Sequence, residues 1–380
     1  MSFWAFFFLS AGPVMAQSAV SSDSIEIGLI TCSPHEEIYS LYGHSALRYH
    51  NLTNGDDVVF NYGIFNFKKP HFILRFVFGL TDYELGISPF DRFCDYYKSW
   101  GSEVKEQVLN LTPAEKNNIA AALAVNLQPE NKIYRYNYFY DNCSTRPRDL
   151  VERNIDGKID YATADDAPTS YRQLVREHVK HHPWAMFGND MLLGVKADMS
   201  ITQRESEFLP KRLAYDFERA VINRGDSCQP LVKETRIHVA HGVQEVEEDF
   251  PLTPMQCALV LLAVSLAVFA AEWRRRRTFK YWDALIMLAC GLAGTIIFVM
   301  LFSQHPTTST NLLIFLLNPL PLFFIPAILR RHTKKRQWWA MLAFIALFFI
   351  GGIWQSYAEG MYVLALCLLI RICSHLRNDK

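Results

Sequence analysis

The cysteine at position 143 stands in a context that suits nucleophilic chemistry. It lies in the segment 140–146 (YDNCSTR), and residues 146–153 follow with helical spacing. A thiol at the start of a helix lies near unpaired backbone N–H groups and the positive end of the helix dipole, which favour the thiolate. The thiolate is the nucleophilic form of cysteine, so this placement predicts covalent catalysis by Cys143.

A catalytic thiol needs a base, and histidine is the usual partner. The best candidate is His44, in the motif 42–45 (YGHS). We interpret the remaining soluble-domain histidines as solvated or structural, and we predict no metal and no cofactor. These competing histidines are His35, His50, His71, His178, His181 and His182.

The elements around His44 predict how it is positioned. Residues 44–50 have the alternation of a strand, and 51–57 contain an Asn-Gly pair that is typical of a hairpin turn. Residues 58–65 would then form the partner strand, which brings Asn61 next to His44. An amide there could orient the imidazole. Tyr62 and Asp82 are alternative orienting groups.

A cysteine with a distant histidine is also the pattern of a buried structural cysteine, and that interpretation stays open at this point. The chain has eight cysteines. Cys257, Cys290, Cys367 and Cys373 lie in or beside apolar segments, where cysteine acts as a small hydrophobic residue. If Cys143 remains free, at most one disulfide can form among Cys32, Cys94 and Cys228.

Charge and hydropathy divide the chain in two. Lys plus Arg and Asp plus Glu both number 38, so the net charge of zero gives no general attraction to nucleic acid. Residues 1–16 are apolar and predict a signal peptide or an N-terminal anchor. Residues 17–250 predict an exported α+β domain, and 251–380 predict an all-α transmembrane domain.

Five apolar segments follow in the second half. Four are near the ~20 residues needed to cross a bilayer, and the fifth either crosses or re-enters. The segments are 252–271, 282–302, 311–329, 338–354 and 357–372. Basic clusters follow the first, third and fifth segments, whereas the loops 303–310 and 355–360 lack Lys and Arg. The positive-inside rule therefore predicts an exported catalytic domain and a cytoplasmic C-terminus.

Two further segments predict contact with lipid or substrate. Residues 68–80 mix basic and aromatic side chains, including Lys68, Lys69 and Arg75, and predict either a core helix or a surface that meets lipid. Asn318, Pro319 and Pro321 should break the third apolar segment. His305 is then predicted to face the same side of the membrane as Cys143.

The other predicted elements of the exported domain follow from caps and periodicity. Residues 112–115 (TPAE) have the sequence of a helix start with a capping box. The predicted elements are a strand at 24–30, a strand-like stretch at 134–140, helices at 112–126, 170–180, 184–193 and 207–222, and a polar strand pair at 235–246.

The motifs resemble those of known thiol enzymes. The segments 42–45 (YGHS), 60–63 (FNYG) and 141–145 (DNCST) resemble the circularly permuted papain-like enzymes, the NlpC-like and lecithin:retinol acyltransferase-like group. More closely, the whole chain resembles the Bacteroidetes lipoprotein N-acyltransferase family called Lnb. That resemblance extends to the membrane half, through 305–306 (HP), 311–313 (NLL) and 318–320 (NPL).

The resemblance implies a two-step acyl transfer. Cys143, with His44 as base, would take an acyl chain from a membrane phospholipid and pass it to the α-amine of a diacylated lipoprotein. Asn61 is our own addition to the catalytic set. Tyr42, Asn142, Arg75 and His305 are expected to contact substrate. The enzyme would reside in the bacterial inner membrane with its catalytic domain in the periplasm.

Two other functions remain open from the sequence. A membrane-anchored cysteine amidase or peptidase acting on cell-wall peptides would use the same pair of residues, with water resolving the acyl-enzyme. A non-enzymatic binding module on a membrane anchor would instead keep Cys143 buried and unreactive.

Overall fold

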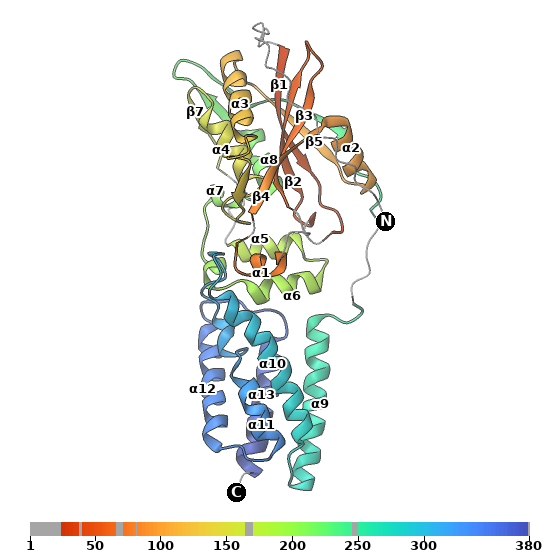
Figure 1. Cartoon of the computed structure of the whole chain (residues 1–380), viewed down its shortest axis with the longest axis vertical. Helices are drawn as coiled ribbons and strands as arrows, with labels where there is room; N and C mark the ends of the chain where they lie inside the picture. Colours follow the sequence, from red (N-terminus) through yellow and green to blue (C-terminus); the bar gives the residue numbers. More distant parts are fainter. Residues whose placement is uncertain are drawn as a thin grey trace.

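A computed structural model describes residues 24–37, 40–65, 71–80, 82–163, 170–244 and 250–378. The predicted signal segment 1–16 and the residues Lys68 and Lys69 lie outside the described residues. The molecule is elongated, with a β-sheet domain at one end and a helical bundle at the other (Figure 1).

An antiparallel sheet of seven strands forms the framework of the first part. Its order is β10-β5-β1-β2-β3-β4-β6. The strands are β1 (Ile25–Cys32), β2 (His44–Asn51), β3 (Asp57–Ile64), β4 (Asp82–Pro89), β5 (Val104–Leu109), β6 (Ile133–Arg135) and β10 (Val232–Val239). A small second sheet contains β7 (Lys158–Asp160), β8 (Val221–Asn223) and β9 (Cys228–Pro230).

Both faces of the large sheet are covered, because alternate residues along each strand point to opposite sides. Ile27, Leu29 and Leu47 pack in one core with α3 (Pro113–Asn126), α4 (Thr145–Arg153) and α8 (Pro210–Arg219). Ile30 and Ala46 pack in another core with α2 (Phe90–Ser99). The predicted hairpin of β2 and β3 is therefore confirmed, and it lies near the centre of the sheet.

The strand predicted at 24–30 and the helices predicted at 112–126, 170–180 and 184–193 are confirmed with small changes at their ends. The capping box of α3 is present at Thr112 and Glu115. The stretch 134–140 was predicted to be strand-like, but strand β6 ends at Arg135. The Asn137 side chain accepts hydrogen bonds from the N–H groups of Phe139 and Tyr140 and so turns the chain.

Two predictions for the C-terminal part of this region were wrong in extent. The helix predicted at 207–222 is only α8, because the β-branched residues Val221 and Ile222 join strand β8 instead. The strand pair predicted at 235–246 is a single strand, β10, at the edge of the large sheet. Residues 245–249 lie outside the described residues.

Short helices lie between the large sheet and the bundle (Figure 1). They include α1 (Phe72–Val77), α5 (Tyr171–His178), α6 (Pro183–Leu192) and the 3-10 helix η3 (Val195–Asp198), and α7 (Gln203–Ser206) lies nearby. Arg172 of α5 organises this region. Its side chain is 1% exposed and bonds to the carboxylates of Asp190 and Asp198 and to the carbonyls of Leu193 and Gly194.

The residues that Arg172 holds form a seam with the bundle. Gly194 N–H donates to the Thr307 carbonyl at 2.8 Å, and Val195 N–H donates to the Thr310 carbonyl at 2.8 Å. The Asn311 amide donates to the Met191 carbonyl, also at 2.8 Å. Backbone bonds of this kind fix the sheet domain against the loop that follows α10.

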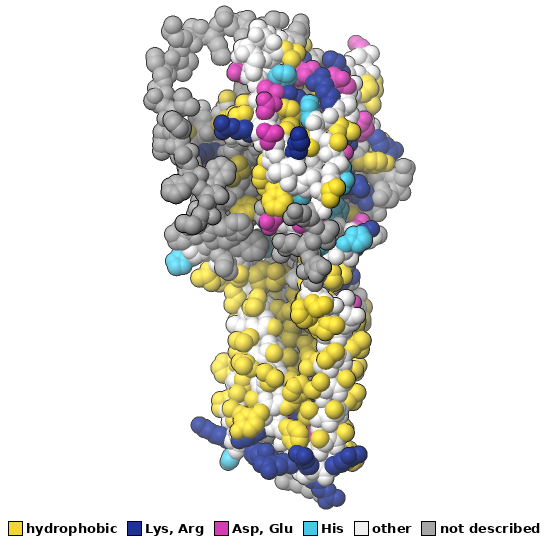
Figure 2. Space-filling view, turned by 90° about the vertical axis from the view of Figure 1, so that its right-hand side faces the viewer, with side chains coloured by type: hydrophobic (Ala, Val, Ile, Leu, Met, Phe, Trp, Pro, Cys, Tyr) yellow, Lys and Arg dark blue, Asp and Glu magenta, His cyan; other side chains and the backbone are white. Residues whose placement is uncertain are grey.

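The bundle contains α9 (Pro254–Arg275), α10 (Lys280–Met300), η4 (Leu312–Phe315), α11 (Leu320–Leu329), α12 (Lys335–Gly351) and α13 (Met361–Asn378). Within the described ranges, three helical segments are long and apolar enough to cross a membrane: α9, α10 and the stretch 312–329. Five such spans were predicted. Figure 2 shows apolar side chains over this part of the molecule and Lys and Arg gathered at its far end.

The predicted break in the third apolar segment is confirmed. Helix η4 ends at Phe315, and α11 begins at Leu320. The broken stretch passes so close to α10 that a Cβ atom on Gly294 would lie 2.2 Å from the Asn318 nitrogen. A glycine at 294 is therefore required by the close approach of the two backbones.

A buried ionic cluster ties three helices together at the basic end of the bundle. Arg371 of α13 donates to Asp283 of α10 at 2.7 Å and to both oxygens of Glu272 of α9 at 2.8 and 2.9 Å. All three side chains are at most 1% exposed. His375 adds a contact of 3.0 Å to Asp283. Polar groups inside a bundle need such partners, because lipid offers none.

Replacing Arg371 with methionine should therefore destabilise the bundle. Two buried carboxylates would lose their counter-charge, a change that costs about 3–5 kcal/mol in buried pairs. Thermal unfolding of the full chain in detergent would measure this as a lower midpoint. Arg274→Met is the matched control, because Arg274 is exposed on α9. Equal shifts in the two variants would contradict the assignment.

Candidate active site

Cys143 lies in a tight turn that leads into α4. The turn is held by Asn142, which is 2% exposed. Its Oδ1 accepts the N–H groups of Ser144 and Thr145 at 2.9 Å each, and its Nδ2 donates to the carbonyls of Tyr138 and Phe208. The Asn142 side chain thus serves as a cap that fixes the position of the thiol at the helix start.

His44 is the first residue of β2 and lies beside the Cys143 thiol, so that each group shifts the pKa of the other. Its Nε2 lies 3.2 Å from Asn61 Oδ1. The Asn61 Nδ2 in turn donates to Ser88 Oγ of β4 at 3.4 Å. Because Nε2 faces Asn61, Nδ1 is the ring nitrogen left for the thiol. Cys143, His44 and Asn61 therefore form a continuous chain of polar contacts.

Two contacts bring the turn and the hairpin into register. Ser45 Oγ and Ser144 Oγ lie 3.0 Å apart and are buried. Gly63 of β3 has a φ of +92°, and a Cβ there would lie 3.2 Å from the Tyr136 ring and 3.9 Å from Cys143 Cβ. The pairing of β3 with β4 is irregular between Asn61 and Ile64. Such bulges re-aim side chains beside functional sites.

The charges of the pair favour the thiolate. Burial of the thiol acts to raise its pKa, but the charge of His44 and hydrogen bonds from His44, the Ser45 N–H and Ser144 outweigh it, so the pKa of Cys143 is lowered. Burial likewise acts to lower the pKa of His44, but Cys143 and Asn61 raise it. These directions are those of a thiolate–imidazolium pair.

The backbone N–H of Cys143 has no hydrogen-bond acceptor among the described residues. Asn142 takes the N–H groups of the next two residues, and among the hydrogen bonds of the described residues none uses the N–H of Cys143. This donor lies at the helix start, next to the sulfur. An oxyanion that forms on a carbon bound to that sulfur would lie near it.

The four residues expected to contact substrate have different surroundings. Asn142 is a cap, as described above, and all its hydrogen bonds go to the protein. The Tyr42 hydroxyl accepts from Asn189 of α6 at 2.9 Å, and its ring packs on Tyr138. These contacts hold Asn142 and the Tyr42 side chain in place, and their contact with substrate stays a prediction.

Arg75 and His305 lie where the sheet domain meets the bundle. Arg75 pairs with Asp82 at 2.7 Å. The His305 backbone packs against Gly79, where an added Cβ would lie 3.0 Å from the His305 nitrogen. Both therefore belong to the side of the domain that faces the membrane, and the described contacts of Cys143 include neither.

The alternative orienting groups and histidines lie elsewhere. The Tyr62 hydroxyl accepts from Asn126, and Asp82 pairs with two arginines. His35 stacks on Trp100 with ring centroids 4.6 Å apart, and His178 Nδ1 lies 2.8 Å from the Leu174 carbonyl oxygen. All eight cysteines are free in the structure. Among the described residues, no group of His, Cys, Asp or Glu gathers in a way that could hold a metal ion.

Sequence reasoning missed several residues of the site. Ser88 and Tyr136 support Asn61 and Cys143 but come from β4 and from the turn after β6, which carry no motif. Gly63 lies inside the FNYG motif, and a glycine two residues after Asn61 on the same strand was a signal that could have revealed the close approach.

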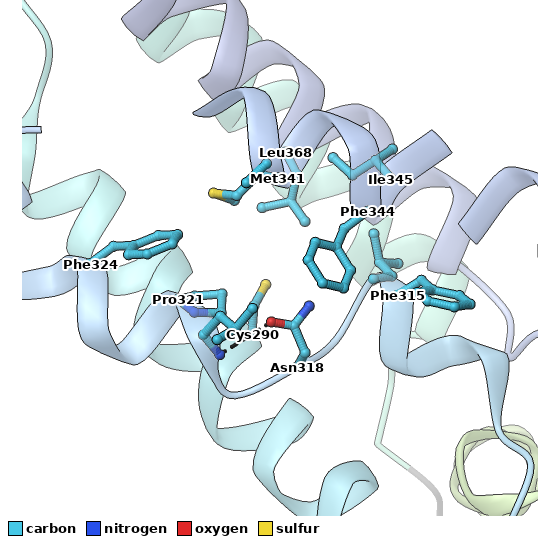
Figure 3. Close-up of a pocket in the computed structure, with 12 residues that line it drawn as sticks. Cys290, Phe315, Asn318, Pro321, Phe324, Met341, Phe344, Ile345 and Leu368 are labelled. Atoms are coloured by element: carbon cyan, nitrogen blue, oxygen red, sulfur yellow. Dashed lines mark hydrogen bonds between the residues drawn. The ribbon is translucent and has the colours of Figure 1, made fainter. Parts of the chain in front are cut away.

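The structure contains a pocket beside the Cys143 turn and another inside the helical bundle. A polar one adjoins the Cys143 turn and is lined by residues that include Tyr140, Asp141, Arg146 and Asp149. The other lies within the bundle, at the break between η4 and α11, and contains no residue of the Cys143 site. Figure 3 shows the Asn318 amide among apolar side chains there, including Phe324, Met341 and Phe344.

The lowered pKa of Cys143 predicts a pH profile of alkylation. Because the thiolate is stabilised, iodoacetamide should modify Cys143 at pH values below the ordinary range of a thiol. His44→Asn removes the cation, so the pKa should rise and the profile should move to higher pH. Peptide mass spectrometry would follow each cysteine separately. Cys94, whose pKa burial raises to about 11, is the internal control, and an unmoved profile in His44→Asn would contradict the pairing.

Comparison with known families gives a consistent result for the two parts of the chain. Residues 13–177 match the model of the Lnb N-terminal periplasmic domain, and residues 245–380 match that of the Lnb transmembrane domain. No curated protein and no solved structure matches the chain. The two matches follow the same order as the sheet domain and the bundle. The chain therefore belongs to the Lnb family, as a membrane-anchored protein with a periplasmic N-terminal domain and a transmembrane C-terminal domain.

Proposed function

We propose that the protein is a lipoprotein N-acyltransferase that works through a thioester on Cys143. The observation that carries this proposal is the contact chain Cys143–His44–Asn61 on a domain fixed against the bundle. Membrane phospholipids are the acyl donors, and diacylated lipoproteins are the acceptors. Family membership supports a role in lipoprotein acylation.

In the first half-reaction, the Cys143 thiolate attacks the ester carbonyl carbon of the donor. The C–S bond forms, and the oxyanion receives a hydrogen bond from the Cys143 N–H. The C–O bond then breaks, and the His44 imidazolium gives its proton to the departing oxygen of the lysophospholipid. The products are a thioester and a neutral imidazole.

In the second half-reaction, the α-amine of the lipoprotein's lipidated cysteine attacks the thioester carbon. His44 takes a proton from the attacking nitrogen, and the C–S bond breaks to return the thiolate. The amide product is a triacylated lipoprotein. Asn61 acts as a positioning residue that holds the ring of His44 with Nδ1 towards the sulfur.

The fold and orientation complete the proposal. A helix-borne cysteine against a histidine on an antiparallel sheet, with the histidine earlier in the chain, supports a permuted papain-like arrangement. The basic end of the bundle faces the cytoplasm, and the C-terminus lies there too. The protein is then a multi-pass protein of the bacterial inner membrane, with α12 and α13 as its last two spans.

Mass spectrometry of lipoprotein N-termini tests this function directly. Cells that carry the wild type should contain N-acylated lipoproteins, and cells that carry Cys143→Ala or His44→Ala should lack them. Without acceptor, the purified wild type should accumulate an acyl adduct on Cys143 that hydroxylamine removes. Peptide cleavage without acyl transfer would instead indicate an amidase, and full function in Cys143→Ala would indicate a binding module.

Steady-state kinetics of acyl transfer should separate the roles of His44 and Asn61. Loss of the general acid–base should slow acylation by roughly 10²–10⁴-fold in His44→Ala. Asn61→Ala leaves the imidazole in place but poorly oriented, so a smaller loss of kcat is expected with little change in KM. Asn61→Gln is the conservative comparison. An Asn61→Ala variant with wild-type kcat would remove Asn61 from the proposed set.

A further inference from the structure

Two arginines converge on one carboxylate beside the bundle. Arg75 Nη2 donates to Asp82 Oδ2 at 2.7 Å, and Arg135 Nε donates to Asp82 Oδ1 at 2.9 Å. The side chain of Arg75 is 43% exposed, that of Arg135 is 44% exposed, and that of Asp82 is 30% exposed. The cluster is therefore open to a ligand while its geometry is held by the two ion pairs.

The cluster has charge and hydrogen-bond donors to spare. Two guanidinium groups and one carboxylate leave one excess positive charge. In the described structure, the bonds of Arg75 use only Nη2, and those of Arg135 use Nε and Nη1. The remaining N–H groups point to no described partner. Guanidinium groups with free donors bind phosphate oxygens well, because their planar fork matches the anion.

The cluster lies beside the end of the bundle that faces the sheet domain. Arg135 Nη1 donates to Gln304 Oε1 at 3.1 Å, and Gln304 N–H donates to the Phe78 carbonyl at 3.0 Å. Gln304 lies just beyond the end of α10. The neighbouring side chains Leu74, Phe78 and Phe302 are 58%, 36% and 67% exposed. Exposed apolar groups next to arginine are typical of the boundary between headgroups and acyl chains.

The residue that follows Arg135 packs beside the Cys143 turn. Arg135 directly precedes Tyr136, whose ring lies next to Gly63 on the side that faces Cys143. Strand pairing places Asp82 opposite Arg135 and Tyr83 opposite Tyr134. The Tyr83 and Tyr136 rings stack with centroids 4.2 Å apart. The cluster is therefore joined to the Cys143 site by a short stretch of chain and by the packing of Tyr83 on Tyr136.

We propose that Arg75 and Arg135, spaced by Asp82, bind the phosphodiester of the donor phospholipid and so present its ester to Cys143. This inference rests on the proposed function. A phosphodiester carries one negative charge, which matches the excess charge of the cluster. The site recognises the phosphate that all such donors share, whereas the group beyond the phosphate faces solvent.

The test compares two acyl donors with the same acyl chains, one with a phosphate and one without. Phosphatidylethanolamine and diacylglycerol are offered to the full-length protein in mixed micelles, and thioester formation on Cys143 is followed by intact-protein mass spectrometry. The wild type should prefer the phospholipid. Arg135→Gln and Arg75→Gln should each raise the apparent KM for the phospholipid roughly tenfold and leave that for diacylglycerol unchanged.

Two further variants separate binding from structure. Asp82→Asn breaks the same ion pairs but adds net positive charge, so it should lower the apparent KM for the phospholipid. A merely structural cluster would respond alike to Arg135→Gln and Asp82→Asn, with both donors affected equally. Lys132→Gln removes a cation that pairs with Glu84 on the same sheet edge and should not change donor preference.

The outcomes distinguish this inference from the proposed function. If the wild type forms a thioester from both donors equally well, and Arg135→Gln does not alter the ratio, the phosphate site is refuted while the transferase stands. If neither donor acylates Cys143, the proposed function itself fails. Inhibition of the wild type by millimolar inorganic phosphate alone, without donor preference, would assign the cluster to a free anion and would also overturn the inference.

Discussion

The placement of the whole sheet domain depends on the buried side chain of Arg172. A guanidinium away from water is unfavourable unless every donor finds a partner. Arg172 meets this demand with Asp190, Asp198 and two backbone carbonyls, and so it fixes the chain around Gly194. That fixed segment then supplies the N–H groups that bond to the loop after α10. The sheet domain that carries Cys143 is thereby held at one height relative to the helical bundle.

The buried groups around the Cys143 sulfur likewise find polar partners within the protein. Removing charge from water disfavours both the thiolate and the imidazolium, but the two ions stabilise each other at contact distance. Asn142 contributes by an indirect route, since it fixes the turn from which the sulfur projects. Ser45 and Ser144 join the strand to the helix start. The arrangement of Cys143 and His44 therefore rests on neutral hydrogen bonds as well as on their charges.

The sequence allowed the prediction of features whose signals are local. Cys143 before a helix, the Asn-Gly hairpin that sets Asn61 beside His44, and the capping box of α3 all follow from a few adjacent residues. The proline-rich break in the third apolar segment is of the same kind. Hydropathy and the basic clusters likewise separated the bundle from the sheet domain.

Features that depend on distant partners could not be predicted in this way. Arg135 and Asp82 are 53 residues apart in the chain, and neither belongs to a motif. The hydrogen bonds by which the Asn142 amide holds the turn reach as far as Phe208, 66 residues along the chain. Arg371 reaches Glu272 across 99 residues. In each case the tertiary fold, which no local pattern reveals, decides what the side chain does.

The seam between residues 193–195 and the loop after α10 has a consequence for how an acceptor is chosen. Because this seam fixes the sheet domain to the bundle, Cys143 cannot travel outwards to meet a polypeptide. Under the proposed chemistry, the acceptor amine must come to the sulfur, and an amine on a lipid-bearing residue is confined near the bilayer surface by its own anchor. The distance of the amine from the bilayer surface then selects the acceptor. Proteins of unrelated sequence would be acylated equally if their amino group lies at the height of the Cys143 sulfur.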